Sequence, residues 1–175
     1  HKAASMQQQN HPVSRSARFP LLPFVLTLAL LAPLTHDRVF LAGNDASRFA
    51  QIEALVDYKQ ESIDASRYNW TIDRVTIAGR DYSNKPPLLA LMGAGVYMVI
   101  KTVTGMTLAL NENIVVYLLN LFLAVLPTAW LVARFHRALE CYAAPGARQL
   151  ATMALAAGTI LTSFSTTLNN HTVSA

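Results

Sequence analysis

The chain has little charge and almost no cysteine. Only 14% of its 175 residues are charged, whereas 53% are hydrophobic, and the mean hydropathy is +0.30. Soluble domains carry about 25% charged residues, so this composition indicates a membrane protein. The single cysteine, Cys141, excludes an intramolecular disulfide and a cysteine-based metal cluster.

The signatures of several other functional classes are missing as well. The sequence contains no glycine-rich nucleotide loop, no zinc-type ligand spacing and no nucleophile elbow. A net charge of +4 would indicate nucleic-acid binding only if the basic residues formed one patch, but they lie beside the hydrophobic runs. In that position they report membrane orientation, and we expect no nucleic-acid partner.

Four hydrophobic runs carry no formal charge. They cover residues 19–34, 88–100, 114–132 and 150–168, with lengths of 16, 13, 19 and 19 residues. A helix needs about 20 mostly apolar residues to cross a bilayer, and about 17 is the lower limit. By this criterion the last two runs are membrane spans, the first is at the margin, and the run at 88–100 is short.

The charges around these runs predict the topology. The charged residues before the first run are all basic, which places the N-terminus in the cytoplasm. A cleaved signal peptide is the alternative. Segment 134–148 carries three arginines and Glu140 as its only acid, which also indicates the cytoplasmic side. The N-terminus and segment 134–148 can both be cytoplasmic only if 88–100 does not cross the bilayer but lies in the membrane interface. Its short length favours the same placement.

We therefore expect an all-α integral membrane protein with three or four transmembrane helices and interfacial helices in a polar extracytoplasmic loop. The expected segments are a disordered cytoplasmic N-terminus at 1–18, a transmembrane helix at 19–35, an extracytoplasmic loop at 36–87 with an amphipathic helix at 45–58, an interfacial or transmembrane helix at 88–104, transmembrane helices at 113–133 and 149–169, and between these two a basic cytoplasmic loop at 134–148. Because the chain has no initiator Met and ends just after a hydrophobic run, we expect an N-terminal fragment of a larger protein.

Most of the charge lies in the stretch 44–87. It contains the sequences N-D-A-S-R-F at 44–49 and Y-S-N-K-P-P at 82–87, which we expect to form two walls of one site at a membrane surface. Between them, apolar residues recur at helical spacing over 45–58. The pattern then changes at Trp70 to a short extended excursion or hairpin, with a turn at 78–81.

Four side chains in or near these sequences are candidates for a site, and each has a plainer interpretation. Asp45 is either a helix-capping carboxylate or a general base or metal ligand. Arg48 either binds a phosphate with two hydrogen bonds or is a solvated surface charge. Lys85, held by Pro86 and Pro87, either pairs with a phosphate or marks the interface. His171 either ligates a metal or contacts a hydroxyl group, or it is satisfied by its neighbours.

The motif at 44–50, followed by Y-S-N-K-P-P-L-L at 82–89, resembles the first extracytoplasmic loop of the GT-C glycosyltransferases. It is most similar to the bacterial branch related to protein O-mannosyltransferases and the lipid A aminoarabinose transferase. The resemblance covers roughly residues 20–171. It implies an integral enzyme of the bacterial inner membrane that moves a sugar from a polyprenyl-phosphate donor to a lipid, glycan or protein acceptor outside the cytoplasm.

The resemblance also implies roles for single residues. Asp45 is the candidate general base or acceptor-orienting carboxylate, and Lys85 is expected near the donor phosphate. The substrate-binding residues that it implies are Arg48, Tyr82, Asn84, Lys85, Asn170 and His171. Many relatives have an acid, sometimes tied to a divalent ion, where this chain has the neutral Asn84, so dependence on a metal stays open.

Two other functions fit the same features. In the first, the protein is a transporter or flippase-like subunit for lipid-linked sugars, and its polar loop binds the lipid without changing the headgroup. In the second, it is a non-enzymatic membrane scaffold that is complete at 175 residues.

Overall fold

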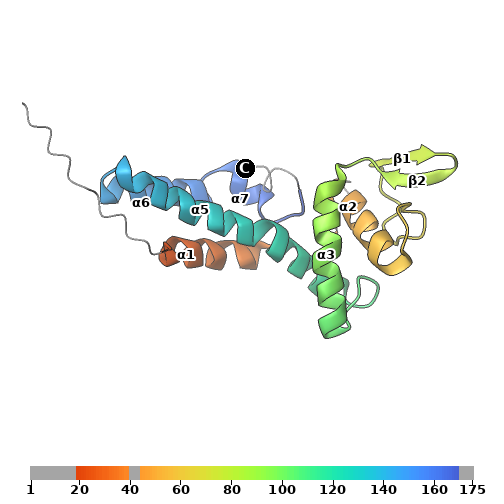
Figure 1. Cartoon of the computed structure of the whole chain (residues 1–175). Coiled ribbons are helices and arrows are strands. Elements are labelled where there is room, and N and C mark those ends of the chain that lie inside the picture. The colour runs from red at the N-terminus through yellow and green to blue at the C-terminus, as the bar shows by residue number, and fades with distance from the viewer. Residues whose placement is uncertain (1–18, 40–43, 170–175) are drawn as a thin grey trace, which may run out of the picture.

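The structure is a computed structural model that describes residues 19–39 and 44–169, so the segment expected at 1–18 lies outside the described residues. Within them the chain is mostly helical, and a single two-stranded hairpin interrupts the helices (Figure 1). The mostly helical fold class predicted from the sequence is confirmed.

The helices and strands follow one another in a simple order. They are α1 (Leu21–Leu31), α2 (Asn44–Glu53), β1 (Arg74–Ile77), β2 (Arg80–Ser83), α3 (Pro87–Thr104), α4 (Glu112–Asn120), α5 (Leu126–Ala138), α6 (Pro145–Ala157) and α7 (Ile160–Phe164). Short 3-10 turns extend α1 to Leu34 and α5 to Cys141, and π-helical turns occupy Ala54–Tyr58 and Leu121–Val125.

Two of the described helices are long and apolar enough to cross a membrane. They are Pro87–Thr104, with 18 residues, and the continuous helix Glu112–Cys141, with 30 residues. The helix at Leu21–Leu34 is apolar but shorter. By length and composition, these helices support a membrane location for the protein.

The longest helix passes through a proline. Pro127 has no N–H to donate, and its ring crowds the carbonyl of the preceding turn. The π-helical turn at Leu121–Val125 lies directly before it and widens the helix there, so that the helix continues. The helix also runs beyond the expected span at 113–133 and takes in the first half of the expected loop at 134–148. The connection to α6 is therefore much shorter than that predicted loop.

The expectation of one helix over 149–169 is corrected. The helix breaks at Gly158 and Thr159, and Thr159 has an extended backbone with φ −120° and ψ 164°. Its hydroxyl donates to the carbonyl of Leu155 at 3.0 Å. Serine and threonine hydroxyls compete with the backbone for such carbonyls, and this segment is rich in both residues, which explains why the apolar run does not give one helix.

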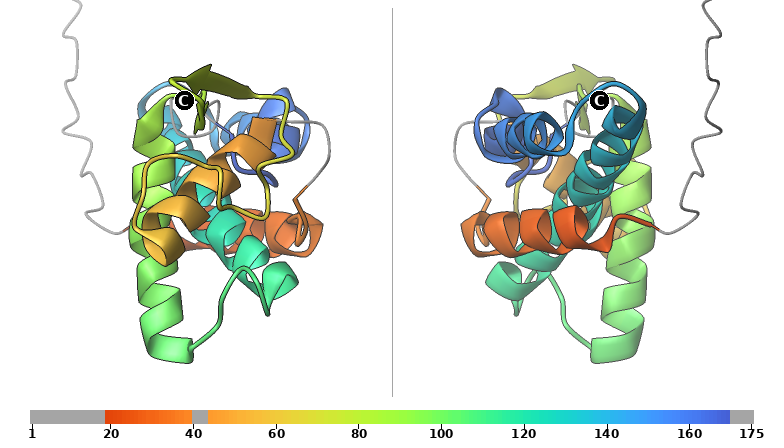
Figure 2. Two further views of the ribbon diagram at one scale, coloured as in Figure 1. Left: turned by 90° about the vertical axis from the view of Figure 1, so that its right-hand side faces the viewer. Right: turned by 90° about the vertical axis from the view of Figure 1, so that its left-hand side faces the viewer.

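The helices form two groups that run in different directions. Helix α5 packs against α1 on one side and α6 on another. The three run in the same general direction in Figure 1, and α1 crosses α5 obliquely in Figure 2. Helix α3 lies crosswise at one end of this group, where it contacts α2 and α4. It stands upright in both views of Figure 2, while α1 runs across them.

Helix α3 is apolar on two opposite faces. The buried face packs against α2 and α4 and consists of Leu89, Ala90, Gly93, Ala94, Tyr97 and Ile100. The exposed apolar face consists of Leu88, Leu91, Met92, Met98, Val99 and Val103. Because hydrophobic side chains on a water-exposed face bring no gain from burial, the second face indicates contact with another apolar surface.

Helices α2 and α3 approach each other closely at Gly93. A Cβ atom placed there would lie 2.4 Å from Cδ1 of Ile52 and 3.5 Å from Cδ1 of Leu123. Glycine therefore lets the backbone of α3 sit directly on the side chains of α2 and of the longest helix. Gly95, two residues away on the exposed side, has no atom within 4 Å of such a Cβ.

We predict that Gly93→Leu destabilises the fold and that Gly95→Leu does not. Overpacking at Gly93 forces α2 away from α3 and costs about 1–3 kcal/mol. At Gly95 the same change improves helix propensity by up to about 1 kcal/mol. Thermal unfolding of both variants in the same detergent measures the difference. Equal destabilisation by the two substitutions would contradict the close packing at Gly93.

Candidate functional site

The hairpin brings the two polar sequences together. Arg74 pairs with Ser83 and Ile77 with Arg80, and the turn consists of Ala78 and Gly79, both with positive φ, at 50° and 78°. Two residues with positive φ are typical of the type I′ turn that matches the twist of a hairpin. The turn is shorter than the expected 78–81, because Arg80 and Asp81 already pair within β2.

Ser47 connects α2 to the open end of the hairpin. Its hydroxyl donates to the carbonyl of Asp73 at 2.6 Å and lies 2.7 Å from Oγ of Ser83. Since the single proton of Ser47 is used on Asp73, Ser83 is the donor in the second bond. The backbone N–H of Asn84 donates to the same carbonyl at 3.4 Å. The polar sequences at 44–49 and 82–87 therefore lie side by side, as the sequence predicts.

Asp73 is the residue that sequence reasoning missed. Its carboxylate pairs with Nζ of Lys85 at 3.0 Å, and both side chains are mostly buried, with exposed fractions of 24% and 18%. Asp73 stands directly before β1 in a segment where charged residues of both signs are common, so nothing in the local pattern marks it. The register of the hairpin places Asp73 opposite Asn84 and so beside Lys85, the next residue along the chain.

Arg48 lies inside the cluster, with 4% of its surface exposed. Its Nη1 donates to the carbonyl of Leu168 at 3.4 Å, which connects α2 to the segment after α7. Burial lowers the pKa of Arg48, while the nearby carboxylates of Asp45 and Asp73 act to raise it. The alternative interpretation of Arg48 as a solvated surface charge is therefore wrong.

Asp45 lies in the first turn of α2 and is partly exposed. Its Oδ1 accepts the N–H of Ala46 at 3.0 Å. A negative charge at this position is favoured by the helix dipole, so the helix-capping interpretation of Asp45 fits the geometry. The charge of the same carboxylate acts to raise the pKa of Arg48.

The other predicted site residues are placed differently. Tyr82 pairs with Val75 in the hairpin, and because successive strand residues point to opposite faces, its ring points away from the side of Ser83. The side chain of Asn84 is exposed. Asn170 and His171 lie outside the described residues. Across the described ranges 19–39 and 44–169, no group of three or more His, Cys, Asp or Glu side chains is arranged to hold a metal ion.

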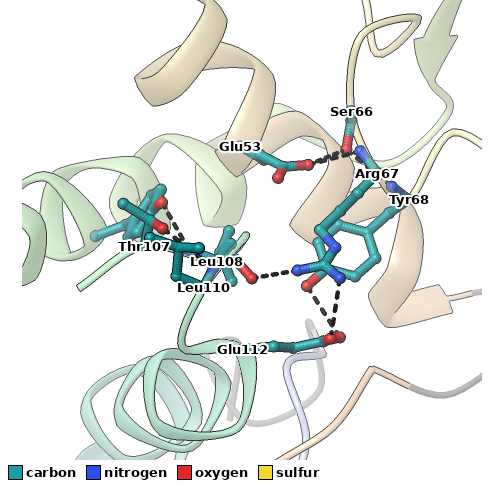
Figure 3. A network of polar contacts seen from close by, with 9 residues as sticks. Glu53, Ser66, Arg67, Tyr68, Thr107, Leu108, Leu110 and Glu112 are labelled. Carbon is teal, nitrogen blue, oxygen red and sulfur yellow. Dashed lines mark hydrogen bonds and ion pairs between the residues drawn. The ribbon is translucent and has the colours of Figure 1, made fainter.

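A second polar network joins the loop after α2 to the loop between α3 and α4 (Figure 3). The buried carboxylate of Glu53 accepts the hydroxyl of Ser66 at 2.6 Å and the N–H of Arg67 at 2.8 Å, both on Oε2. Arg67 also donates to the carbonyl of Leu108 and pairs with Glu112 at 3.6 Å. The loop after α2 is thereby attached to the loop between α3 and α4.

The other end of α3 is held by a similar ion pair. Nζ of Lys101 lies 2.6 Å from Oδ1 of Asp57, and the hydroxyl of Tyr97 donates to Oδ2 of the same carboxylate at 2.8 Å. The backbone N–H of Leu108 donates to the Tyr97 hydroxyl at 2.9 Å. Helix α3 thus carries one Lys–Asp pair beside each of its ends, and each pair connects it to the polar region.

Comparison of the chain with protein-family models, with curated proteins and with solved structures gives no match.

The carboxyl group of Glu53 makes stability depend on pH. Burial raises the pKa of Glu53 above its ordinary value of 4.5. The folded protein then holds this proton at pH values where the unfolded chain has already lost it. The stabilisation from Glu53 is therefore complete below the unfolded pKa and is lost as the pH rises through the raised, folded pKa.

We predict that Glu53→Gln gains stability relative to the wild type as the pH rises above 4.5, and that this difference levels off once the pH has passed the raised pKa of Glu53. The glutamine oxygen can accept both bonds now made by Oε2, without the cost of a buried charge. Glu53→Ala is the control, because it leaves Ser66 and Arg67 without their acceptor and costs about 1–3 kcal/mol. Unfolding curves across the pH range measure the effect, and a difference that is constant with pH would contradict it.

Proposed function

We propose that this chain acts as a membrane glycosyltransferase, which moves a sugar from a polyprenyl-phosphate donor to an extracytoplasmic acceptor. The observation that supports the proposal is the joining of the sequences at 44–49 and 82–87 into one cluster beside an apolar helix. Asp45 is the proposed base or acceptor-orienting carboxylate. Lys85 is the proposed contact of the donor phosphate.

The directions of the helices support a particular membrane arrangement. We propose that the helix Glu112–Cys141 crosses the bilayer with α1 and α6 alongside it. At 1.5 Å per residue, 30 residues extend about 45 Å, which exceeds the roughly 30 Å hydrocarbon core. Because α3 runs crosswise to this group, it cannot follow the same membrane normal. It lies in the interface in this arrangement, with its exposed apolar face on lipid.

This placement suits a donor with a lipid tail. A polyprenyl phosphate keeps its chain in the bilayer and its phosphate at the interface, which is the proposed level of α3. Lys85 lies just before the N-terminus of α3, where backbone N–H groups and the helix dipole favour an anion. The ammonium group of Lys85 has three N–H donors, so it can keep its bond to Asp73 and still donate to a phosphate.

The proposed reaction uses the two charges in different ways. The carboxylate of Asp45 takes the proton of the acceptor nucleophile as that nucleophile attacks the anomeric carbon. The bond from the anomeric carbon to the phosphate oxygen breaks, and the ammonium group of Lys85 offsets the charge that develops on the departing phosphate. In this proposal Asp73 holds Lys85 in position, and Arg48 holds Asp45.

We expect Asp45→Asn and Lys85→Ala in the full-length protein each to lower sugar transfer by about 10²-fold or more, as is typical for loss of a catalytic acid–base group or a charge-stabilising donor. Lys101→Ala is the matched control, because Lys101 makes the same kind of ion pair at the other end of α3. The measurement is transfer of labelled sugar from a polyprenyl-phosphate donor, at equal amounts of folded protein.

Wild-type transfer in both site variants would exclude the proposed roles. Loss of transfer in Lys101→Ala to the same extent would show that removing either ion pair of α3 abolishes transfer, and would also contradict the specific role of Lys85. Thermal unfolding of the three variants separates loss of activity from loss of fold.

The membrane arrangement is tested by cysteine labelling. In a Cys141→Ser background, we expect Arg137→Cys to react with a membrane-permeant maleimide only, because it lies at the end of the long helix away from the hairpin. Ile77→Cys, in the exposed strand β1, should react with an impermeant reagent added from outside. Labelling of Arg137→Cys from outside would contradict the interfacial placement of α3.

A further inference from the structure

A second candidate site is lined by residues of α1, α5 and α6, the helices that lie away from the hairpin in Figure 1. A groove of about 900 Å³ runs there between α1 and α6, and its floor is the end of α5. Its walls are apolar and include Leu22, Leu26 and Met153, whose exposed fractions are 66%, 60% and 67%. Such a volume is large enough for a drug-sized ligand.

One end of the groove is polar and carries a cation. Nε of Arg148 is buried and makes no hydrogen bond within the part of the chain that the structure describes. Nη1 of the same side chain lies 3.4 Å from the carboxylate of Glu140, which leaves other donors of the guanidinium unused by that contact. Nδ1 of His136 lies 2.9 Å from Oγ1 of Thr152 at the same end.

Two formal charges line this polar end, those of Arg148 and Glu140, and the two side chains pair with each other. The segment 134–148 contains three arginines and one acid, Glu140. Arg148 belongs to the groove, whereas Arg134 is exposed and lies over the ring of Trp130, at 5.8 Å from its centroid. Apolar walls beside a guanidinium group that Glu140 uses only in part match an amphiphile with an acyl chain and a phosphate headgroup.

We propose that this groove binds an anionic glycerophospholipid, with its phosphate at Arg148 and an acyl chain along α1 and α6. A guanidinium group is suited to phosphate because it can donate two parallel hydrogen bonds. The exposed leucines and Met153 then lie against hydrocarbon. Basic pockets between membrane helices are a common setting for such headgroups. The proposal depends on the membrane location of the chain and is independent of sugar transfer.

The test uses the full-length protein in a mild detergent, titrated with phosphatidylglycerol or phosphatidylcholine and observed by native mass spectrometry. We expect phosphatidylglycerol to bind more tightly than phosphatidylcholine. Arg148→Gln should weaken the binding of phosphatidylglycerol about tenfold, as for the loss of a charged hydrogen bond. Arg134→Gln is the matched control, with the same change of charge in the same segment, and should leave the affinity unchanged.

A second pair of variants tests the apolar part without altering charge. Met153→Trp fills the groove, and we expect it to weaken the binding of phosphatidylglycerol. Val103→Trp adds the same ring to the exposed face of α3, at a side chain with an exposed fraction of 77%, and should leave the binding unchanged. This pair keeps the test decisive even where Arg148→Gln fails to fold.

Several results would overturn the proposal. Equal affinities for the two lipids, or equal losses in Arg148→Gln and Arg134→Gln, would show that the cationic end selects no headgroup. A lipid-free dimer that Met153→Trp dissociates would show that a second copy of the chain occupies the groove. Because sugar transfer is measured separately, failure here would leave the proposed function untouched.

Discussion

The buried charge of Arg48 is the constraint on which the polar half of this structure depends. Taking a guanidinium out of water costs several kcal/mol unless opposite charges and hydrogen-bond acceptors surround it. Asp45, Asp73 and the carbonyl of Leu168 fulfil this need, and they come from α2, from the start of the hairpin and from the segment after α7. Satisfying one buried cation therefore fixes three distant parts of the chain together.

The acids around α3 connect its two ends to the polar region in a comparable way. Asp73 accepts Lys85 beside one end, and Asp57 accepts Lys101 and Tyr97 near the other. Between these pairs, close packing at Gly93 holds α2 on the helix. A site that stabilises developing charge needs donors that are fixed before the reaction begins. The ion pairs and the packing supply this rigidity to a region that contains little regular secondary structure.

Sequence reasoning predicted the parts of the site that local patterns define. The helix dipole and capping chemistry mark Asp45, the prolines mark Lys85, and the change of period after Trp70 marks the hairpin. Asp73 was missed because its role depends on strand register, which its neighbours do not encode. The break at Gly158 was missed because hydropathy counts the hydroxyl side chains of that run as neutral, although they compete for the carbonyl groups that a helix needs.

The basic segment 134–148 illustrates a different limit. Its charges indicate the side of the membrane, but a charge does not end a helix, and the helix continues to Cys141. The predicted loop at 134–148 assumed that the helix ends where the chain leaves the bilayer. These are two separate positions in the chain. The end of a helix is marked by turn-forming residues or by a proline that follows it, and the first proline after this helix is Pro145.

The position of α3 shows why a single segment is the wrong unit for judging a membrane helix. By its own composition α3 is apolar on both faces, and its length allows it to cross a bilayer. One of those faces is covered by α2. Helix α2, the loop after it and the hairpin carry the charges of the stretch 44–87. The amphipathic unit is thus formed by α3, α2 and the hairpin together, with an apolar side on α3 and a polar side on the other two. Hydropathy read along α3 alone cannot contain this information, because the polar side of the proposed interfacial unit is built from residues that lie elsewhere in the sequence.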